Sequence, residues 1–369
     1  MNLGFDAKRA FHNASGLGNY SRFVIRTLAE NFPESSYLLF NPKGSDKWEL
    51  NTHESIQEVL PPKNAWSSYW RSFHGSKKVT EFNLDVYHGL SNELPFGIAS
   101  SKANKVVTIH DLIFKRFPEL YQAPDRFIYD KKFKHAVSVA NTVVAVSETT
   151  KQDIMTFYDI PEEKIKVIYQ GCNPLFYQLS SEENVNLTRE RYNLPKDFII
   201  CVGTIEERKN GLQILKALVN CNIDIPIVFV GRPTKYKELI ICEIAEHNQL
   251  KNQVLFIENA NNEELKELYQ LAQFSVYPSI FEGFGIPVLE SIAAGTPVIT
   301  NKAGCFKEAG GEAAFYVNPN NSEEFGEAIK LLTDNAEILN RLKLAATNHL
   351  ENFKEAELAA QLMSIYKKA

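Results

Sequence analysis

The strongest chemical signal in this chain is a glycine-containing turn between an apolar segment and a helix, with a carboxylate on each side. The segment Phe274–Ile299 reads FSVYPSIFEGFGIPVLESIAAGTPVI, so an expected strand ends at Pro278 and Pro287 opens a helix. Such a turn suits a phosphate, because backbone N–H groups and the helix N-terminus favour an anion. Glu282 and Glu290 can each accept hydrogen bonds from vicinal hydroxyls. Together they predict a ribose and a hexose on either side of a diphosphate. The alternative is a purely structural tight turn.

A second candidate phosphate site follows the apolar segment FIICVG. Arg208 and Lys209 stand there at the start of the expected helix GLQILKALV. Cations at a helix N-terminus run against the helix dipole, and an anion nearby would make them easier to accommodate. The alternative is a pair of solvated surface cations.

The first half of the chain places further groups at the carboxyl ends of expected strands, where ligands enter α/β sheets. Gly16 and Gly18 follow the strand Leu3–Asp6 and open a helix. His110 and Asp111 end a later strand. A lone His-Asp pair is not a zinc site, so we expect His110 to make a polar contact with a ligand. A structural turn remains the alternative for the two glycines.

Several kinds of chemistry lack their motif. The chain has no G-x-S-x-G for a hydrolase nucleophile and no G-x-x-x-x-G-K-[ST] for a P-loop. It also has no D-x-D triplet, which commonly carries a donor's diphosphate on a divalent metal. We therefore expect no metal and no cofactor, with cationic side chains and backbone amides binding the phosphates instead.

Composition is that of an ordinary globular protein, with 44% apolar and 23% charged residues. The length of 369 residues suits two domains of roughly 150 to 200 residues each. No window is apolar enough to span a membrane and the start lacks a signal peptide, so a cytoplasmic protein is expected. Residues 1–170 carry 21 Lys+Arg and 19 Asp+Glu, and the rest 19 and 26, so net charges of +2 and −7 make up the total of −5. This balance argues against nucleic acid as a partner.

Short apolar runs alternate with amphipathic helical stretches along the whole chain, which predicts an α/β fold with a parallel sheet in each half. The polar segment Gly171–Lys196 suits a connection between domains. We expect an N-terminal domain at 1–175 and a C-terminal domain at 190–350. The last helix, at 354–369, needs a docking surface, which either domain could offer, including a return to the N-terminal one.

Taken in order, these motifs resemble those of the family 4 retaining glycosyltransferases. That family has the GT-B architecture, in which two Rossmann-like domains face each other across a cleft. The resemblance runs the length of the chain and rests on the following segments: Asp6, the G-x-G-x-Y turn at Gly16–Tyr20, His110-Asp111-Leu112, Val146–Glu148, Gly203-Thr204 to Arg208-Lys209-Asn210, and E-G-F-G-I-P-V-L-E.

The resemblance implies a role for each matching residue. Arg208 and Lys209 would stabilise the diphosphate of the donor as it leaves. Glu282 and His110 would contact the donor sugar, with Glu282 as a positioning residue rather than a base. Together these four form the predicted catalytic set. The predicted donor-binding residues are Gly16, Gly18, Gly283, Phe284, Gly285, Ile286 and Glu290, the last of them on the ribose.

The arrangement G-T-x-E-x-R-K-N looks most like that of bacterial mannosyltransferases, which implies transfer of mannose to a glycan or lipid-linked glycan in polysaccharide or lipopolysaccharide biosynthesis. GDP-mannose is therefore favoured over UDP-sugars as the donor. Alternatives are a UDP-sugar-dependent transferase, another GT-B enzyme such as a nucleotide-sugar epimerase or a phosphorylase, and a non-catalytic nucleotide-sugar-binding subunit. Thr204 and Gln170 depart from the common family pattern, which has arginine and asparagine there.

The acceptor is expected on the N-terminal domain, which mixes aromatic and basic residues. Such segments can rest on an anionic bilayer, so peripheral contact with the inner face of the cytoplasmic membrane is a hypothesis. The alternative is an aromatic edge of the core with solvated lysines. The residues concerned are Trp66, Tyr69, Trp70, Arg71, Phe73, His74, Lys77, Lys78, Lys115-Arg116-Phe117 and Arg126–His135.

Overall fold

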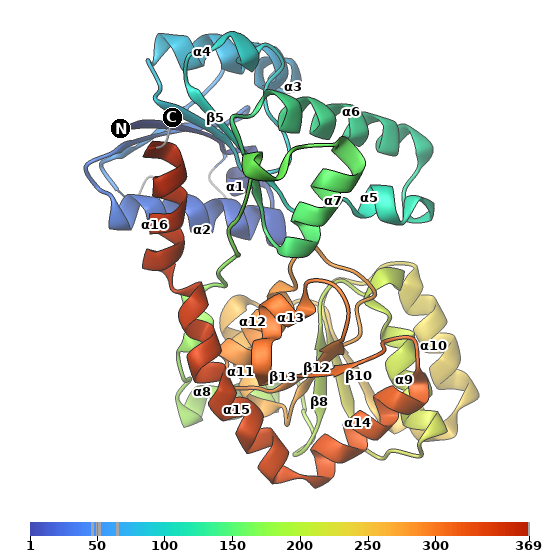
Figure 1. Ribbon diagram of the computed structural model, residues 1–369. Coiled ribbons are helices and arrows are strands. Elements are labelled where there is room, and N and C mark those ends of the chain that lie inside the picture. The colour runs from blue at the N-terminus through green and yellow to red at the C-terminus, as the bar shows by residue number, and fades with distance from the viewer. Residues whose placement is uncertain (46–47, 49, 51–52, 64–65, 368–369) are drawn as a thin grey trace. The chain divides into compact units, whose positions relative to one another are not determined.

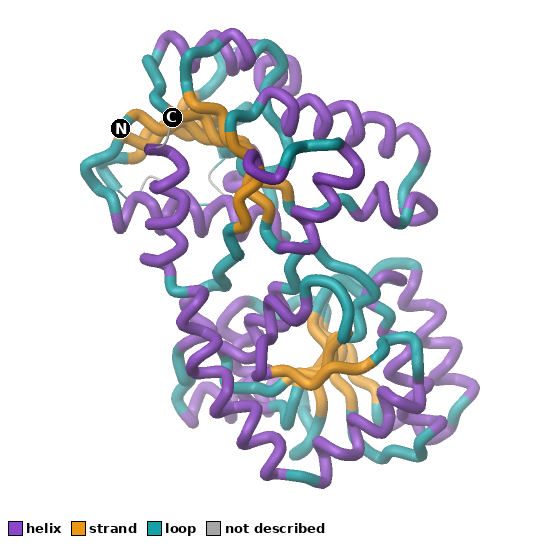
Figure 2. Tube along the Cα trace, viewed as in Figure 1, coloured by secondary structure: helices purple, strands orange, loops and turns teal. Residues whose placement is uncertain are grey.

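The computed structural model describes residues 1–45, 48, 50, 53–63 and 66–367. Contacts divide the chain into two compact units (Figure 1). The first unit joins Met1–Gly171 to the segment that begins at Phe353, and the second is Cys172–Asn352. Figure 2 shows the strands gathered inside each unit with helices around them.

A parallel sheet forms the centre of the first unit. Among the described residues it has seven strands, in the order β3-β2-β1-β4-β5-β6-β7, and every neighbouring pair is parallel. The sequence does not predict the edge strand β3, because its IQEV segment is short and only partly buried. The strands are β1 (Asn2–Asp6), β2 (Ser36–Phe40), β3 (Ile56–Val59), β4 (Val86–Gly89), β5 (Asn104–Ile109), β6 (Thr142–Ala145) and β7 (Ile165–Val167).

The helices of the first unit cover both faces of its sheet. Successive residues of a strand point to opposite faces, so in β2 Tyr37 and Leu39 join one apolar cluster while Leu38 and Phe40 join another. The first cluster also holds residues of α2 and α16, and the second holds residues of α4 and α6. The helices are α1 (Lys8–His12), α2 (Gly16–Asn31), α3 (Ser67–Tyr69), α4 (Gly75–Glu81), α5 (Ile113–Arg116), α6 (Ala123–Val139), α7 (Glu148–Tyr158) and α16 (Glu355–Lys367).

The C-terminal helix α16 packs against α2 (Figure 1). Its Tyr366 lies in the apolar core, and the Tyr366 hydroxyl lies 2.6 Å from Nδ1 of His88. At the other end of the helix, Glu355 pairs with Arg26 of α2. The last helix therefore completes the core of the first unit.

The second unit repeats the same architecture. Its described residues form a six-stranded parallel sheet in the order β10-β9-β8-β11-β12-β13. The strands are β8 (Ile199–Val202), β9 (Ile227–Val230), β10 (Val254–Ile257), β11 (Ser275–Tyr277), β12 (Val298–Asn301) and β13 (Ala314–Val317). The helices are α8 (Glu182–Arg191), α9 (Gly211–Asn220), α10 (Tyr236–Glu246), α11 (Asn262–Leu271), α12 (Ile286–Ala293), α13 (Phe306–Gly310), α14 (Ser322–Asp334) and α15 (Ala336–Leu350).

The segment that we expected to connect the domains, Gly171–Lys196, is instead largely part of the second unit. It contains α8, which packs on α11. The buried Thr188 hydroxyl donates a hydrogen bond to the Glu267 carboxylate at 2.5 Å. In α8 this polar contact takes the place of part of the usual apolar stripe, so its sequence shows only weak helical periodicity. For this reason the prediction that the segment is a linker is wrong.

Within the described part of the chain, no helix combines the length and the apolar character that a membrane span requires.

Candidate active site

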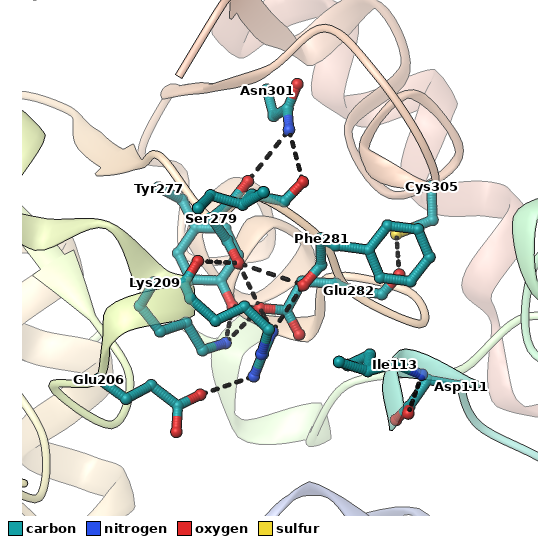
Figure 3. A network of polar contacts seen from close by, with 12 residues as sticks. Asp111, Ile113, Glu206, Lys209, Tyr277, Ser279, Phe281, Glu282, Asn301 and Cys305 are labelled. Atoms are coloured by element: carbon teal, nitrogen blue, oxygen red, sulfur yellow. Dashed lines mark hydrogen bonds and ion pairs between the residues drawn. The ribbon is translucent and has the colours of Figure 1, made fainter. Parts of the chain in front are cut away.

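Glu282 lies at the centre of a polar network that follows the carboxyl end of β11 (Figure 3). Its Oε1 atom lies 2.5 Å from Nη1 of Arg208 and 2.5 Å from Nζ of Lys209. The same oxygen accepts hydrogen bonds from the hydroxyls of Tyr277 at 2.9 Å and Ser279 at 2.7 Å. The fold thus brings together the two cations and the glutamate that the sequence placed in separate motifs.

The network keeps Glu282 ionised. Burial on its own would raise the pKa of this carboxyl, but the charges of Lys209 and Arg208 outweigh burial and lower the pKa to about 2. The pairing with Glu282 in turn raises the pKa of Arg208, although burial acts in the opposite direction. A carboxyl with so low a pKa is a poor base near neutral pH. Glu282 can therefore orient a ligand but has little capacity to take up its proton.

Arg208 is held in a fixed orientation by further contacts. Its Nη1 donates to the carbonyl of Phe281 at 2.6 Å, and its Nη2 lies 2.7 Å from Oε1 of Glu206. The side chain is 17% exposed, so it is largely desolvated yet still reaches the surface. A guanidinium with several fixed N–H groups suits the oxygens of a diphosphate.

The loop after β11 is anchored from behind by the next strand and helix. At the end of β12, Nδ2 of Asn301 donates to the carbonyls of Ser279 at 3.1 Å and Ile280 at 3.0 Å. The thiol of Cys305 donates to the carbonyl of Glu282 at 3.2 Å (Figure 3). These contacts fix the backbone of the loop without using the carboxylate of Glu282.

Gly285 ends this loop and caps α12. Its φ of +104° lies in the left-handed region that favours glycine. The helix begins at Ile286, so Pro287 is its second residue and lies in the first turn, where its missing N–H costs little, as predicted. The N-terminus of α12 supplies backbone N–H groups and partial positive charge at the end of the glycine loop.

Glu290 lies inside α12 and is partly buried. Burial raises the pKa of its carboxyl to about 7, with Lys209 acting in the opposite direction. The carboxyl of Glu290 therefore titrates near neutrality, whereas that of Glu282 does not. An ionised Glu290 can accept a hydrogen bond from a ribose hydroxyl at each of its two oxygens, whereas in the protonated acid one of these oxygens acts as a donor.

His110 is buried just beyond β5, and both of its ring nitrogens have protein partners. Nε2 lies 2.9 Å from the carbonyl of Leu90, which can only accept, so Nε2 carries the proton. Nδ1 lies 2.9 Å from the side-chain amide nitrogen of Gln170. Burial lowers the pKa of this imidazole to about 4. His110 is therefore neutral, and a ring contact with a sugar would have to displace one of these two partners.

The two glycines of the first turn differ in their surroundings. Gly18 is buried in α2, and a Cβ atom there would lie 1.8 Å from the backbone oxygen of Asn13. Gly16 is exposed at the start of the same helix, and no described atom lies within 4 Å of its Cβ position. Packing alone accounts for Gly18, while Gly16 has room for a ligand.

The aromatic and basic residues of the first unit also divide into two groups. Trp70 is buried and the Arg71 side chain is 11% exposed, whereas Trp66, Phe73 and Phe127 are 85%, 47% and 60% exposed. The side chain of His74 lies outside the described part of the structure. In the sequence these exposed aromatic residues alternate with lysines and arginines. Most of the aromatic and basic residues predicted for a mixed surface are therefore at least partly exposed.

Sequence reasoning did not identify Tyr277, Ser279, Asn301 and Cys305 as part of the site. The first three lie at or just beyond the carboxyl ends of β11 and β12, where polar side chains could have been collected as candidates. Cys305 follows no strand directly and offered no signal. Among the residues that the structure describes, no group of three His, Cys, Asp or Glu side chains could hold a metal ion.

Two family profiles match consecutive parts of this chain. The profile "Glycosyltransferase Family 4" matches residues 15–174, and "Glycosyl transferases group 1" matches residues 185–349. The two ranges do not overlap: the first lies in the first unit except for residues 172–174, and the second lies wholly in the second unit.

Two curated relatives and one solved structure extend the likeness. O-antigen chain mannosyltransferase B of Escherichia coli is 23% identical over 338 residues, which are 87% of each chain. O-antigen chain mannosyltransferase RfbU of Salmonella typhimurium is 30% identical over 258 residues, 68% of this chain and 67% of that protein. The structure of HepE from Anabaena, solved in complex with UDP, is 16% identical, has a TM-score of 0.76 and covers 100% of this chain and 99% of that one. The last match confirms the predicted GT-B fold class.

Proposed function

Because this chain belongs to the group 1 glycosyltransferases of family 4, we propose that it transfers mannose from GDP-mannose to a hydroxyl of a glycan or lipid-linked glycan acceptor. Family membership makes the chain a glycosyltransferase. Mannose is favoured because the two curated relatives are O-antigen mannosyltransferases at 23% and 30% identity. The assembly of a surface polysaccharide is the corresponding role.

The observation that carries the proposal is the meeting of Arg208 and Lys209 on one oxygen of Glu282. A diphosphate would find two fixed cations beside a carboxylate that stays ionised, next to the N-terminus of α12. The cations would stabilise the charge that grows on the leaving diphosphate. The contacts described above all end on Oε1 of Glu282, so Oε2 is the oxygen that would accept a hydroxyl of the transferred sugar.

We infer that transfer retains the configuration at the anomeric carbon. The bond from this carbon to the diphosphate breaks, and a bond to the acceptor oxygen forms on the same face. The proton of the acceptor hydroxyl passes to an oxygen of the leaving phosphate. Glu282 is a poor candidate for this proton because its pKa lies near 2. Arg208 and Lys209 provide the positive charge in this scheme, so activity should persist in excess EDTA.

A direct contact between His110 and the donor sugar stays a prediction. Since both ring nitrogens are engaged, the ring could turn to a sugar hydroxyl only if Gln170 gave up Nδ1. Gly16 would be the glycine of the first turn that approaches a phosphate, since Gly18 is enclosed by packing.

The competing donor class is a UDP-sugar, because the structurally similar HepE was solved with UDP. Thermal shift with GDP, UDP, ADP and their sugar conjugates separates the two. A ligand at 100 times its dissociation constant adds about 2.7 kcal/mol of stability. We expect the largest shift with GDP or GDP-mannose, and a reduced shift in Glu290→Ala. A larger shift with UDP would replace GDP-mannose by a UDP-sugar, and no shift with any nucleotide would oppose the whole proposal.

We also propose peripheral contact of the first unit with an anionic bilayer. The support is the exposure of Trp66, Phe127 and Ile128, together with the Lys131 ammonium, which lies 4.3 Å from the centroid of the Phe127 ring. Lysine side chains near such a surface each add about 1 kcal/mol of attraction. Liposome flotation tests this: the protein should float with anionic vesicles at low salt and much less with neutral ones. Protein that stays at the bottom of the gradient with both would refute the proposal.

A further inference from the structure

A polar pocket lies in the first unit, where the carboxyl end of β1 meets the segment after β4. The enclosed space is ≈ 10 Å³, room for roughly one water molecule, so a larger ligand would rest at its mouth and reach in with single polar groups. Ligands enter parallel α/β sheets at this edge, so the position is suited to binding. The residues that line it are Asp6, Arg71, Ser72, Glu93, Leu94, Pro95, Phe96 and Lys132.

Arg71 forms the base of this acidic and basic pocket. Its Nε donates to both carboxylate oxygens of Asp6, at 3.1 and 2.9 Å, and its Nη1 donates to Oε2 of Glu93 at 2.7 Å. The side chains of Arg71 and Asp6 are only 11% and 4% exposed. In a buried ion pair the attraction between the charges often does not exceed the free energy lost on desolvation. Apolar residues of similar size would stabilise the fold at least as much. Here the buried Asp6–Arg71 pair serves to hold Glu93, the more exposed carboxylate, in a fixed position.

The upper part of the pocket keeps hydrogen-bonding capacity. Oε2 of Glu93 is occupied by Arg71 and also lies 3.2 Å from Nζ of Lys132. The second oxygen, Oε1, can still accept a hydrogen bond, and the Lys132 ammonium has three donors of which this pair uses one. Glu93 and Lys132 are 19% and 31% exposed, so a ligand can reach them. An acceptor beside a donor suits two adjacent hydroxyls of one sugar ring.

An apolar wall completes the pocket. Phe96 stacks on Phe73, with ring centroids 5.5 Å apart and an interplanar angle of 25°. The centroid of the Phe96 ring also lies 4.6 Å from that of His135, which is on the same helix as Lys132. The ring is thus held in place by two neighbours. A rigid apolar surface with a few placed polar groups is the usual form of a small-ligand site.

We propose that this pocket binds an uncharged sugar ring of the acceptor through two adjacent hydroxyls held by Glu93 and Lys132. The lining carries two carboxylates and two cations, so its charges cancel. A neutral ring leaves both ion pairs intact, whereas a phosphate or carboxylate would set its charge against Glu93. The inference rests on the proposed function, since it names the acceptor class of the same enzyme.

Saturation-transfer NMR with the full chain tests the proposal. The probes are methyl α-D-mannopyranoside, which is neutral, and mannose 6-phosphate, which is anionic. We expect the neutral glycoside to bind more tightly. Glu93→Gln should weaken its binding about tenfold or more, because a hydrogen bond to a charged group is lost. The matched control is Glu30→Gln, which removes an exposed carboxylate paired with Arg26 in the same unit and should change nothing.

Each outcome decides the proposal. Absence of binding by the neutral glycoside, equal binding in wild type and Glu93→Gln, or tighter binding of the phosphate would overturn it. Should Glu93→Gln fail to fold, Lys132→Met removes the second contact and leaves the Arg71–Glu93 pair in place. Thermal shift by GDP or UDP reports separately on the second unit. A normal nucleotide shift without sugar binding would refute the pocket alone, and loss of both in wild type would refute the proposed function.

Discussion

The ammonium of Lys209 lies 2.5 Å from Oε1 of Glu282, and its charge also opposes the rise that burial causes in the pKa of Glu290. The two carboxyls nevertheless differ widely, with pKa values of about 2 and about 7. Direct pairing with two cations outweighs burial at Glu282, whereas burial prevails at Glu290. One acid is therefore permanently charged, and the other changes its charge near physiological pH.

Replacement of Glu282 by glutamine should lower both stability and activity. Arg208 and Lys209 would lose a buried counter-charge, and breaking such a pair typically costs about 3–5 kcal/mol. Transfer should fall by about a hundredfold, the effect of losing one well-placed polar group. Urea unfolding and a transfer assay measure the two effects. Glu258→Gln, which removes the partner of Lys237 in an ion pair nearer the surface, should change stability by less than about 1 kcal/mol. Equal losses in the two variants would contradict the central place of Glu282.

Glu290 should give the second unit a characteristic pH dependence. Its folded pKa of about 7 lies above the ordinary value of 4.5, so between these values the folded protein binds more protons than the unfolded chain. This group therefore weakens the fold as pH rises from 4.5 through about 7. Glu290→Gln should remove that slope, which urea unfolding at several pH values would measure.

The same titration should appear in nucleotide binding. Ionised Glu290 accepts hydrogen bonds from ribose hydroxyls better than the protonated acid, so affinity for GDP should rise through the pKa of about 7. Titration of the GDP phosphates also changes the affinity with pH. The Glu290→Gln variant is the control, because its pH profile contains the phosphate contribution alone. Parallel pH profiles in wild type and variant would show that Glu290 does not face the ribose.

His110 and His88 should remain uncharged well below the usual pH range of histidine. Burial lowers the pKa of His110 to about 4 and that of His88 to about 3. Because the unfolded chain takes up these protons first, both groups favour the fold above about pH 6.5, and that stability is lost as pH falls toward 4 and 3. NMR of labelled histidine should show constant shifts for both rings between about pH 8 and 5, where an exposed imidazole titrates. A midpoint near 6.5 for either ring would be inconsistent with its burial.

The motifs of the proposed donor site can be located from local signals in the sequence. Glycine and proline mark the turn at Gly285 and Pro287, and cations at a helix start mark Arg208 and Lys209, so residue types and spacing are enough to locate both motifs. Their meeting on Glu282 follows from the parallel sheet, which brings the ends of β8 and β11 together.

The rest depends on contacts between distant residues. Arg71 and Asp6 are 65 positions apart, and no spacing rule predicts that one guanidinium will bind both oxygens of that carboxylate. Likewise, Gln170 could be seen as a departure from the family pattern, but its contact with His110 could not. Helix α8 was missed because hydrogen bonding of Thr188 replaced the periodic apolar signal that identifies a helix.

Glycine-to-alanine substitutions in the first turn should distinguish a structural role from a role in ligand binding. Gly18→Ala should be strongly destabilising, by several kcal/mol, because its Cβ would lie 1.8 Å from the backbone oxygen of Asn13 and the helix would have to move. Gly16→Ala meets open space in a helical residue, so it should leave the fold unchanged or stabilise it by about 0.4–1 kcal/mol. If Gly16 admits a donor phosphate, the same methyl group should still reduce transfer. Thermal unfolding together with a transfer assay on both variants measures this. Full activity in a stable Gly16→Ala protein would remove Gly16 from the donor site and leave the first turn a purely structural feature.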